Sequence, residues 1–307
     1  MEIRKALNQA LAELMREDEK ICILDADLSK PNGTSNLYTE FPERCFNVGI
    51  AEANMVGIAA GLSAYGFKPV ILSFAPFVTR RVCDQIAVSV AYAKQNVKII
   101  GTDPGITAEI NGGTHMSFED VATLRSIPTM DIYDATDSTQ MYQAIKQIMK
   151  TNNPCYIRTS RKFSKQVFDE NYKFQLYKSD VVREGTDITV LASGIMVYET
   201  LTIIDKLKEE GISVELISVN TIKPLDEEAI LKSVKKTNHL VTCENHNVIG
   251  GLYSAVSELM AEKYPIKIDK IAVMDQFGQV GKYNDLLECY HLTGNDIYDT
   301  IKKNLSK

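Results

Sequence analysis

Apolar residues follow two alternating patterns along the whole chain. Short apolar runs, such as 21–24, are separated by longer segments in which apolar residues recur every three or four positions. In the segment 4–16, for example, Leu7, Leu11 and Leu14 fall on one helical face. Short apolar runs are typical of buried strands, and the longer period is typical of amphipathic helices. Strands that alternate with helices predict parallel sheets with right-handed crossovers.

This alternation occurs in two blocks joined by a polar, irregular stretch at 160–180. The first block is predicted to contain strands 21–24, 45–48, 69–73, 97–101, 131–133 and 155–157, with helices 4–16, 52–64, 79–92 and 138–149. The second is predicted to contain strands 188–192, 214–218 and 239–242, with helices 197–210, 226–235 and 251–262. We therefore expect an α/β fold of two consecutive doubly wound domains with mostly parallel sheets, at 1–165 and 181–307, with a linker at 166–180.

Composition narrows the class of protein. The 307 residues are 45% hydrophobic and 24% charged, which is ordinary for a globular protein of two domains. The net charge is -6 and no Lys/Arg-rich block occurs, so we expect no nucleic-acid partner. No apolar run approaches the ~18 residues of a membrane span, and no signal segment is visible. We expect a cytoplasmic protein without a membrane partner.

The six cysteines are spread along the chain without a CxxC pair: Cys22, Cys45, Cys83, Cys155, Cys243 and Cys289. Most lie in apolar or strand-like runs. This pattern favours buried, reduced thiols over disulfides or a zinc site.

Glu52 is the first residue that could carry chemistry. It stands where a predicted strand gives way to a helix rich in small residues, among them Gly57 and Ala60. A carboxylate against such a closely packed surface needs a hydrogen-bonding partner, because burying it alone is costly. The alternative is a water-exposed glutamate that the helix dipole favours.

Three further groups follow predicted strands, where open α/β sheets bind ligands. The loop Asn111-Gly-Gly-Thr-His115 could approach a ligand closely through its glycines, although a loop histidine is often only structural. Phe74-Ala-Pro-Phe77 with Arg80 and Arg81 could hold a flat ring and an anion, or could be core and surface residues. Arg158-Thr-Ser-Arg161 suits a phosphate, or is linker charge.

These segments, in this order, resemble the transketolase family and its relative deoxyxylulose-phosphate synthase. The resemblance covers essentially the whole chain. It rests on Arg4-Lys-Ala, Asp25-Ala-Asp27, Gly49-Ile-Ala-Glu52, Phe74-Ala-Pro-Phe77, Gly112-Gly-Thr-His115, Ser160-Arg161, Thr221-Ile-Lys-Pro-Leu-Asp226 and Glu244-Asn-His-Asn-Val-Ile-Gly-Gly251.

The resemblance implies an enzyme that uses thiamine diphosphate and Mg²⁺ to move a two-carbon ketol unit between sugars or sugar phosphates. Glu52 matches the glutamate that hydrogen-bonds the cofactor's aminopyrimidine. Phe77 matches the aromatic that stacks on that ring, and Phe74, Asp27 and Arg80 are expected close to the cofactor. Matching substrate contacts are His115, which is also expected to be catalytic, together with Asn111, Arg4 and Arg161.

Two features depart from the family pattern. Full-length relatives hold Mg²⁺ and the diphosphate in a domain with a Gly-Asp-Gly…Asn signature, which this sequence lacks. The resemblance therefore implies a partner subunit that supplies this domain, with this chain dimerising inside an α₂β₂ assembly. Asn111 and Thr102 stand where many transketolases have an aspartate and a second histidine, so the sugar recognised is expected to differ.

Two other functions remain open. The β subunit of a 2-oxoacid dehydrogenase shares the architecture, although Gly112-Gly-Thr-His-Met-Ser-Phe-Glu-Asp120 resembles the sugar-using branch. A non-catalytic scaffold would not need Glu52, Phe77 and His115. His246 receives no chemical role, and a structural or interface function is the simpler interpretation.

Overall fold

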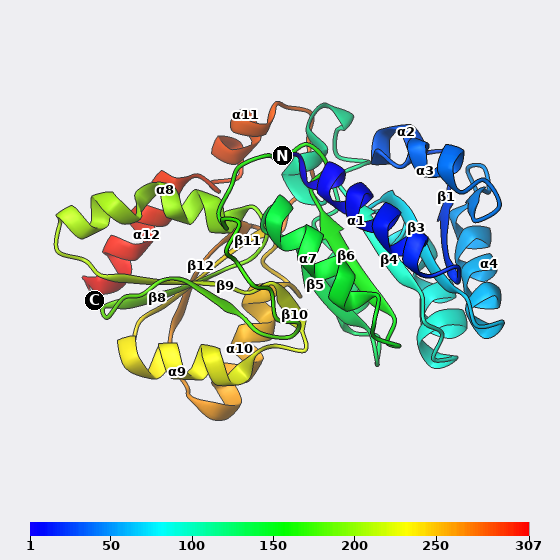
Figure 1. Ribbon diagram of the computed structural model, residues 1–307. Helices are drawn as coiled ribbons and strands as arrows, with labels where there is room; N and C mark the ends of the chain where they lie inside the picture. Colours follow the sequence, from blue (N-terminus) through cyan, green and yellow to red (C-terminus); the bar gives the residue numbers. More distant parts are fainter. Residues whose placement is uncertain (307) are drawn as a thin grey trace.

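The computed structural model describes residues 1–306, in which two sheets lie side by side and the N-terminus lies between them (Figure 1). The first half contains α1 (Ile3–Glu17), β1 (Ile21–Asp25), α2 (Ser29–Asn32), α3 (Ser35–Glu40), β2 (Cys45–Asn47), α4 (Glu52–Ala64), β3 (Lys68–Phe74), η1 (Arg80–Val82), α5 (Cys83–Gln85), η2 (Ile86–Tyr92), β4 (Lys98–Thr102), η3 (Gly105–Asn111), α6 (Asp120–Arg125), β5 (Asp131–Asp134), α7 (Ser138–Ile148) and β6 (Cys155–Thr159).

After a stretch without helix or strand, the second half contains β7 (Asp180–Arg183), β8 (Ile188–Ala192), α8 (Met196–Glu209), β9 (Val214–Ser218), β10 (Thr221–Lys223), α9 (Glu227–Thr237), β11 (Leu240–Asn247), α10 (Leu252–Lys263), β12 (Ile268–Val273), α11 (Tyr283–Cys289) and α12 (Gly294–Leu305).

The first sheet has seven strands in the order β10-β5-β6-β4-β3-β1-β2, parallel except at β10. Successive strand residues face opposite sides of a sheet. Ile21 and Ile23 accordingly pack with α1 and α7, whereas Cys22 and Leu24 pack with α4, η2 and α6. Both faces are therefore covered by helices, which explains why the strands read as continuous apolar runs.

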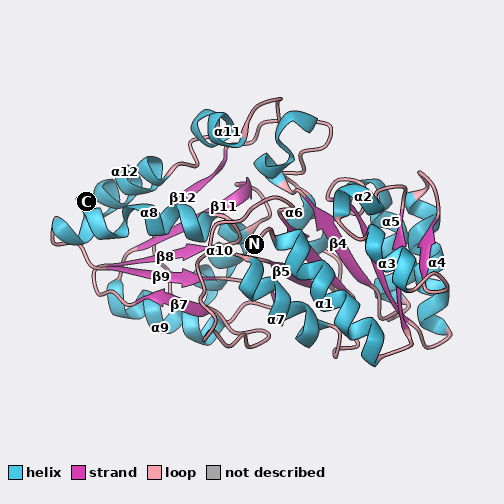
Figure 2. Cartoon of the chain, turned by 45° about the horizontal axis from the view of Figure 1, so that its top comes forward, coloured by secondary structure: helices cyan, strands magenta, loops and turns pink. Residues whose placement is uncertain are grey.

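The second sheet has five strands in the order β12-β11-β8-β9-β7, with only β7 antiparallel. Helices α8, α11 and α12 cover one face, and α9 and α10 cover the other (Figure 2). The predicted α/β fold with mostly parallel sheets in two domains is confirmed.

The two halves interlock. Strand β10 follows β9 in sequence, yet it pairs antiparallel with β5 in the first sheet, with Thr221 opposite Tyr133. In the other direction, Ile106 and Phe118 of the first half pack into the core of the second. The periodicity of the sequence did not predict these contacts between the halves, because a strand of three residues, such as β10, is too short to show a period.

The single helix predicted for 79–92 is wrong. The chain instead forms the 3₁₀ turn η1, the short helix α5 and the π-helical segment η2. The Thr79 hydroxyl donates to the Ala75 carbonyl at 2.6 Å, and the Arg81 N–H donates to Pro76, five residues back. The bond to Pro76 spans five residues, whereas an α-helical bond spans four, so this segment is not a regular α-helix.

All six cysteines are free, as predicted, but Cys289 is exposed. Burial raises the pKa of the Cys22 and Cys243 thiols to about 12. Over residues 1–306, no helix is both long enough and apolar enough to cross a bilayer. Within the same range, no group of three or more His, Cys, Asp or Glu side chains is arranged to hold a metal ion.

Candidate active site

The carboxyl ends of β1, β3, β4 and β6 lie at one edge of the first sheet, because these strands run parallel. Asp27, Phe74, Asp103 and Arg161 lie at or just after these strand ends. Such an edge is where open parallel sheets bind ligands. The sheet topology thus gathers most of the predicted site residues in one place.

Glu52 is the first residue of α4, and only 4% of its surface is exposed. Its Oε1 accepts a hydrogen bond from Arg81 Nη1 at 2.8 Å, within an ion pair. The interpretation of Glu52 as a water-exposed helix residue is therefore wrong. Its carboxylate is held in the protein by a cation, as a buried charge requires.

Three rings pack together beside this carboxylate. The centroids of Phe74 and Phe77 are 5.9 Å apart, and the imidazole of His115 lies 5.4 Å from Phe74 and 5.2 Å from Phe77. All three contacts are edge-to-face, which aromatic rings favour. Thr114 Oγ1 lies 2.9 Å from His115 Nδ1 and orients the ring further. The aromatic segment and the glycine loop, separate in sequence, form one surface.

Arg81 connects this surface to Glu52. Its guanidinium lies 3.9 Å from the Phe77 ring centroid while it donates to Glu52. One flat, N–H-bearing group therefore contacts the carboxylate and the aromatic face at the same time. A planar group that carries N–H donors can therefore bond to Glu52 and stack on Phe77 at the same time.

Arg161 is held from two sides. Its guanidinium pairs with Asp103 at 2.5 Å, and its Cζ lies 4.6 Å from the centroid of the Phe74 ring. Asp103 Oδ1 also accepts the backbone N–H of Arg161 at 2.8 Å. Burial raises the pKa of Asp103, and Arg161 opposes that rise. This arginine is fixed by a carboxylate at the rim of the aromatic surface.

Arg4 and Asp27 lie around the same edge. The backbone N–H of Arg4 donates to the Arg161 carbonyl at 3.3 Å, and its side chain binds Glu2 and the Pro31 carbonyl, each at 3.0 Å. Asp27 has a positive φ of 62° and exchanges two hydrogen bonds with Asn47, of 3.0 and 3.1 Å.

Three further residues were singled out from the sequence: Arg80, Asn111 and Thr102. Arg80 turns to Glu119, with its Nη1 2.6 Å from Oε1, and does not pair with Glu52. Asn111 is exposed at the end of η3. Thr102 is buried, and its hydroxyl lies 3.2 Å from both Asn32 Oδ1 and the Ser73 carbonyl.

Two domain models of known families match this chain. The transketolase pyrimidine-binding domain matches residues 1–165, and the transketolase C-terminal domain matches residues 177–297. The chain belongs to the transketolase family.

Its relatives in the family include proteins of similar length. The chain is 46% identical over 295 residues to the 6-deoxy-6-sulfo-D-fructose transketolase subunit of Clostridium sp. (strain MSTE9), covering 96% of this chain and 92% of that protein. It is 32% identical over 305 residues to an apulose-4-phosphate transketolase subunit of Phocaeicola vulgatus, covering 99% and 97%. A solved split-gene transketolase, described as an inactive β4 tetramer, superimposes with a TM-score of 0.93 at 40% identity, covering 100% of this chain and 99% of that one.

Membership of the transketolase family implies dependence on thiamine diphosphate, and the site fits part of that cofactor. The planar guanidinium of Arg81 donates a hydrogen bond to Glu52 and stacks on Phe77. The aminopyrimidine ring is also planar and carries N–H groups. This ring could therefore make the same two contacts as the Arg81 guanidinium.

Sequence reasoning named Arg81 only together with Arg80 and expected Arg80 at the cofactor, and it missed Asp103 in this transketolase-family chain. Helical spacing could not choose between Arg80 and Arg81, because the irregular turns that follow Thr79 decide which of them faces Glu52. Asp103 directly follows the central strand β4, and its position at a strand end was a usable signal.

Arg158 is neither linker charge nor a free phosphate-binding residue. It is buried and pairs with Asp120 at 2.7 Å and Asp134 at 2.8 Å, and it donates to the Asn245 carbonyl at 2.9 Å. Tyr156 adds a 2.6 Å hydrogen bond to Asp120. The two carboxylates raise the pKa of the guanidinium against its burial. The arginine thus fastens the first half of this transketolase-family chain to β11.

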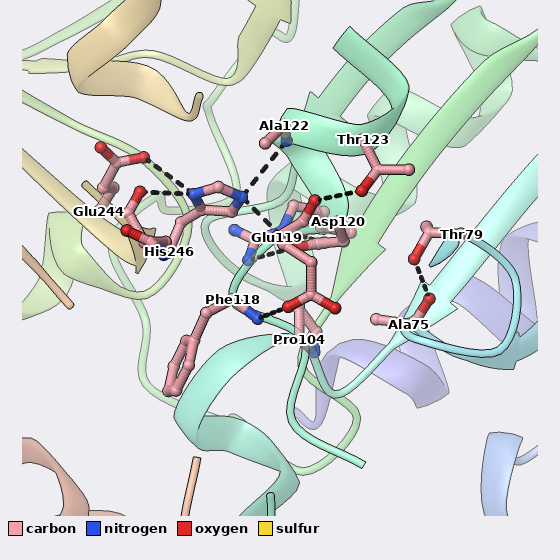
Figure 3. Close-up of polar contacts among 12 residues, drawn as sticks. Ala75, Thr79, Pro104, Phe118, Glu119, Asp120, Ala122, Thr123, Glu244 and His246 are labelled. Carbon is pink, nitrogen blue, oxygen red and sulfur yellow. Dashed lines mark hydrogen bonds and ion pairs between the residues drawn. The ribbon is translucent and has the colours of Figure 1, made fainter. Parts of the chain in front are cut away.

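His246 belongs to the same contact region (Figure 3). Its Nδ1 lies 2.7 Å from the Asn247 carbonyl, and its Nε2 lies 3.4 Å from the backbone nitrogen of Ala122 in α6. Burial lowers the pKa of His246 to about 4, so the ring is neutral at pH 7. Neighbouring Glu244 accepts the N–H groups of Leu252 and Tyr253 at the start of α10, and burial raises its pKa to about 7.

Proposed function

We propose that this chain is the C-terminal subunit of a two-chain, thiamine-diphosphate-dependent transketolase. It would transfer a two-carbon ketol unit from a ketose to an aldose, either free or phosphorylated. The observation that carries the proposal is the buried Glu52 beside Phe77, with a planar N–H group bridging the two. Thiamine diphosphate, when bound, supplies the carbon nucleophile that attacks the donor carbonyl.

The chain's own residues have distinct roles in this proposal. Glu52 would accept a hydrogen bond from the aminopyrimidine and bias its proton distribution, and Arg81 would release the carboxylate as the ring enters. Phe77 would stack on the ring, with Phe74 and Asp27 beside it. Arg80, through its ion pair with Glu119, would steady this segment rather than touch the ring.

His115 is half-buried and packs against Phe74 and Phe77, and we propose that it contacts the donor oxygens near the reacting carbonyl. Arg4, Asn111 and Arg161 would bind the rest of the sugar. Binding energy from that remote end orients the donor for reaction. The named relatives act on different sugars, so family membership alone leaves the sugar open.

A partner subunit would hold the diphosphate and Mg²⁺. This proposal is supported by the description of two relatives as transketolase subunits, and of a solved neighbour as an inactive β4 form of a split-gene enzyme. The sequence of this chain carries no Gly-Asp-Gly signature. Two copies of this chain and two of the partner would form the α₂β₂ assembly.

The test is reconstitution with a partner chain that carries the Gly-Asp-Gly…Asn signature. Glu52→Ala in this complex should lower kcat by about 100-fold or more, which is the usual scale for an acid–base group. Exposed Glu43 provides the matched control, since Glu43→Ala removes a carboxylate near the opposite end of β2. The unmixed chain with cofactor and Mg²⁺ serves as the blank.

Product analysis distinguishes the alternatives. Full activity of Glu52→Ala would refute the role of the carboxylate and leave a scaffold function. Acyl transfer to lipoamide would instead identify a 2-oxoacid dehydrogenase subunit. Turnover by the unmixed chain would rule out the two-chain arrangement.

A further inference from the structure

Two arginines mark the proposed sugar-binding end of the site, and a lysine adjoins one of them in the sequence. Arg4 and Arg161 are joined through their backbones by the 3.3 Å hydrogen bond from the Arg4 nitrogen to the Arg161 carbonyl. Lys162 follows Arg161 directly. A phosphate dianion is held by charge-assisted hydrogen bonds, and it binds best to cations whose N–H groups are not already paired with a carboxylate.

Each of these cations instead has a carboxylate of its own. Arg161 pairs with Asp103 at 2.5 Å, and Arg4 pairs with Glu2 at 3.0 Å. Lys162 lies 3.8 Å from Glu109. The three pairs together carry no net charge. Nearby Lys165 is exposed and lies 5.4 Å from the ring of Tyr198.

The Asp103–Arg161 pair is the deepest of the three. The Asp103 side chain is 3% exposed and the Arg161 side chain 7%, so water contributes little to screening them. The guanidinium is also stacked on Phe74, and Asp103 Oδ1 is tied to the Arg161 backbone nitrogen. A ligand that reaches Arg161 therefore meets the Asp103 carboxylate at short range.

We propose that Asp103 is a specificity-determining residue. It makes the site prefer sugars whose far end carries at most one negative charge over sugars that end in a phosphate dianion. This inference rests on the proposed function and narrows its substrate class. A sugar hydroxyl both donates and accepts, so it can bond to a carboxylate and a guanidinium together, whereas a phosphate dianion offers only acceptors.

The rival explanation is that Asp103 merely aims Arg161 at a phosphate. The two explanations predict opposite signs for one substitution. Asp103→Asn keeps an oxygen for the Arg161 backbone N–H and removes the negative charge. Under our proposal, phosphorylated donors improve, because repulsion of like charges in a protein site is strong. Under the rival explanation, they become worse.

The experiment compares three donors that differ only at carbon 6: D-fructose, 6-deoxy-6-sulfo-D-fructose and D-fructose 6-phosphate. They are assayed with the reconstituted complex and one uncharged acceptor, D-glyceraldehyde. The native complex should show kcat/KM for the phosphate no higher than for the other two. Asp103→Asn should raise the phosphate-to-fructose ratio of kcat/KM about tenfold or more, mainly through KM.

Matched variants separate local from global effects. Glu43→Gln changes the net charge equally at a distant exposed site and should leave the ratio unchanged. Glu2→Gln releases Arg4 and should move the ratio in the same direction as Asp103→Asn, which keeps the test informative if the buried variant folds poorly. A native complex that prefers the phosphate tenfold, or an Asp103→Asn ratio that falls, would overturn the proposal.

Calorimetric titration with inorganic phosphate tests the same inference without turnover. Asp103→Asn in the complex should bind phosphate about tenfold more tightly than the native complex does. Equal or weaker binding would refute the role of Asp103. Absence of ketol transfer with every donor, together with tighter phosphate binding by the variant, would count against the proposed function alone.

Discussion

At the scale of single residues, Gly105 lies at a close contact between the two halves. Its φ is +59°, and a Cβ at this position would lie 2.2 Å from Asn245 Oδ1. Gly211 has a φ of +80° with open space around it. A substitution at Gly211 therefore measures only the free-energy cost of placing a side chain on a left-handed backbone. Gly211→Ala should destabilise by about 1–2 kcal/mol, from the left-handed conformation alone.

Gly105→Ala should lower the free energy of unfolding by more than Gly211→Ala does. Overpacking against Asn245 adds about 1–3 kcal/mol to the same backbone strain. Urea unfolding of the two variants measures the difference. Equal losses would mean that Asn245 moves aside freely and that the close approach is unimportant for stability.

Individual site residues differed in how far the sequence could place them. Glu52 was placed at a helix start because the change from strand to helix period is visible there. The sequence could not show that Arg81, rather than Arg80, contacts Glu52, because the turns around Thr79, which bonds to Ala75, are irregular. His115 could be named, but its contact with Phe74 depends on how separate strands come together.

At the scale of elements, the segment from Pro104 to His115 is held by β11 of the second half. Asn245 Oδ1 accepts the Ile106 N–H at 3.0 Å, and its Nδ2 donates to the Pro104 carbonyl at 3.1 Å. Asn245→Ala leaves two buried backbone groups without these partners, at a cost of about 1–3 kcal/mol. The Ile106 amide should therefore exchange with deuterium about 10- to 100-fold faster.

Hydrogen exchange of the full chain measures this local opening. Asn36→Ala, at an exposed asparagine that bonds to Asn8, is the control and should leave Ile106 unchanged. Unchanged exchange in the Asn245 variant would show that the segment is held by its apolar side chains instead.

Most long elements were predictable, and the short ones were not. Strands such as 188–192 and the helix 52–64 have the predicted bounds, because apolar periodicity is strong in buried parallel sheets and their covering helices. Helices α2 and α3 and strand β10 were not among the predicted elements. Such short segments are fixed by tertiary contacts rather than by their own periodicity.

At the scale of the whole molecule, two buried groups between the halves titrate in opposite senses. The pKa of Glu244 rises from 4.5 to about 7, so its contribution to stability is full below pH 4.5 and falls up to pH 7. The pKa of His246 falls from 6.5 to about 4, so its contribution is full above pH 6.5 and is lost toward pH 4. Between pH 4.5 and 6.5, the effects of Glu244 and His246 on the free energy of unfolding oppose each other.

Separate substitutions should uncover each effect. Relative to the native chain, Glu244→Gln should gain about 3 kcal/mol of unfolding free energy as the pH rises from 4.5 to 7. His246→Gln should lose a similar amount between pH 4 and 6.5. Urea unfolding across this range checks both signs. Parallel curves for the native chain and either variant would contradict the corresponding assignment.

Strand β10 has a consequence for recombining this protein with its relatives. A chimera joined within 166–180 would exchange the whole second half, yet it would also replace one of the two edge strands of the first sheet. The incoming strand would have to match β5, with which Thr221 and Lys223 pair across a shift in register. Functional hybrids should therefore require β5 and β10 to come from the same parent.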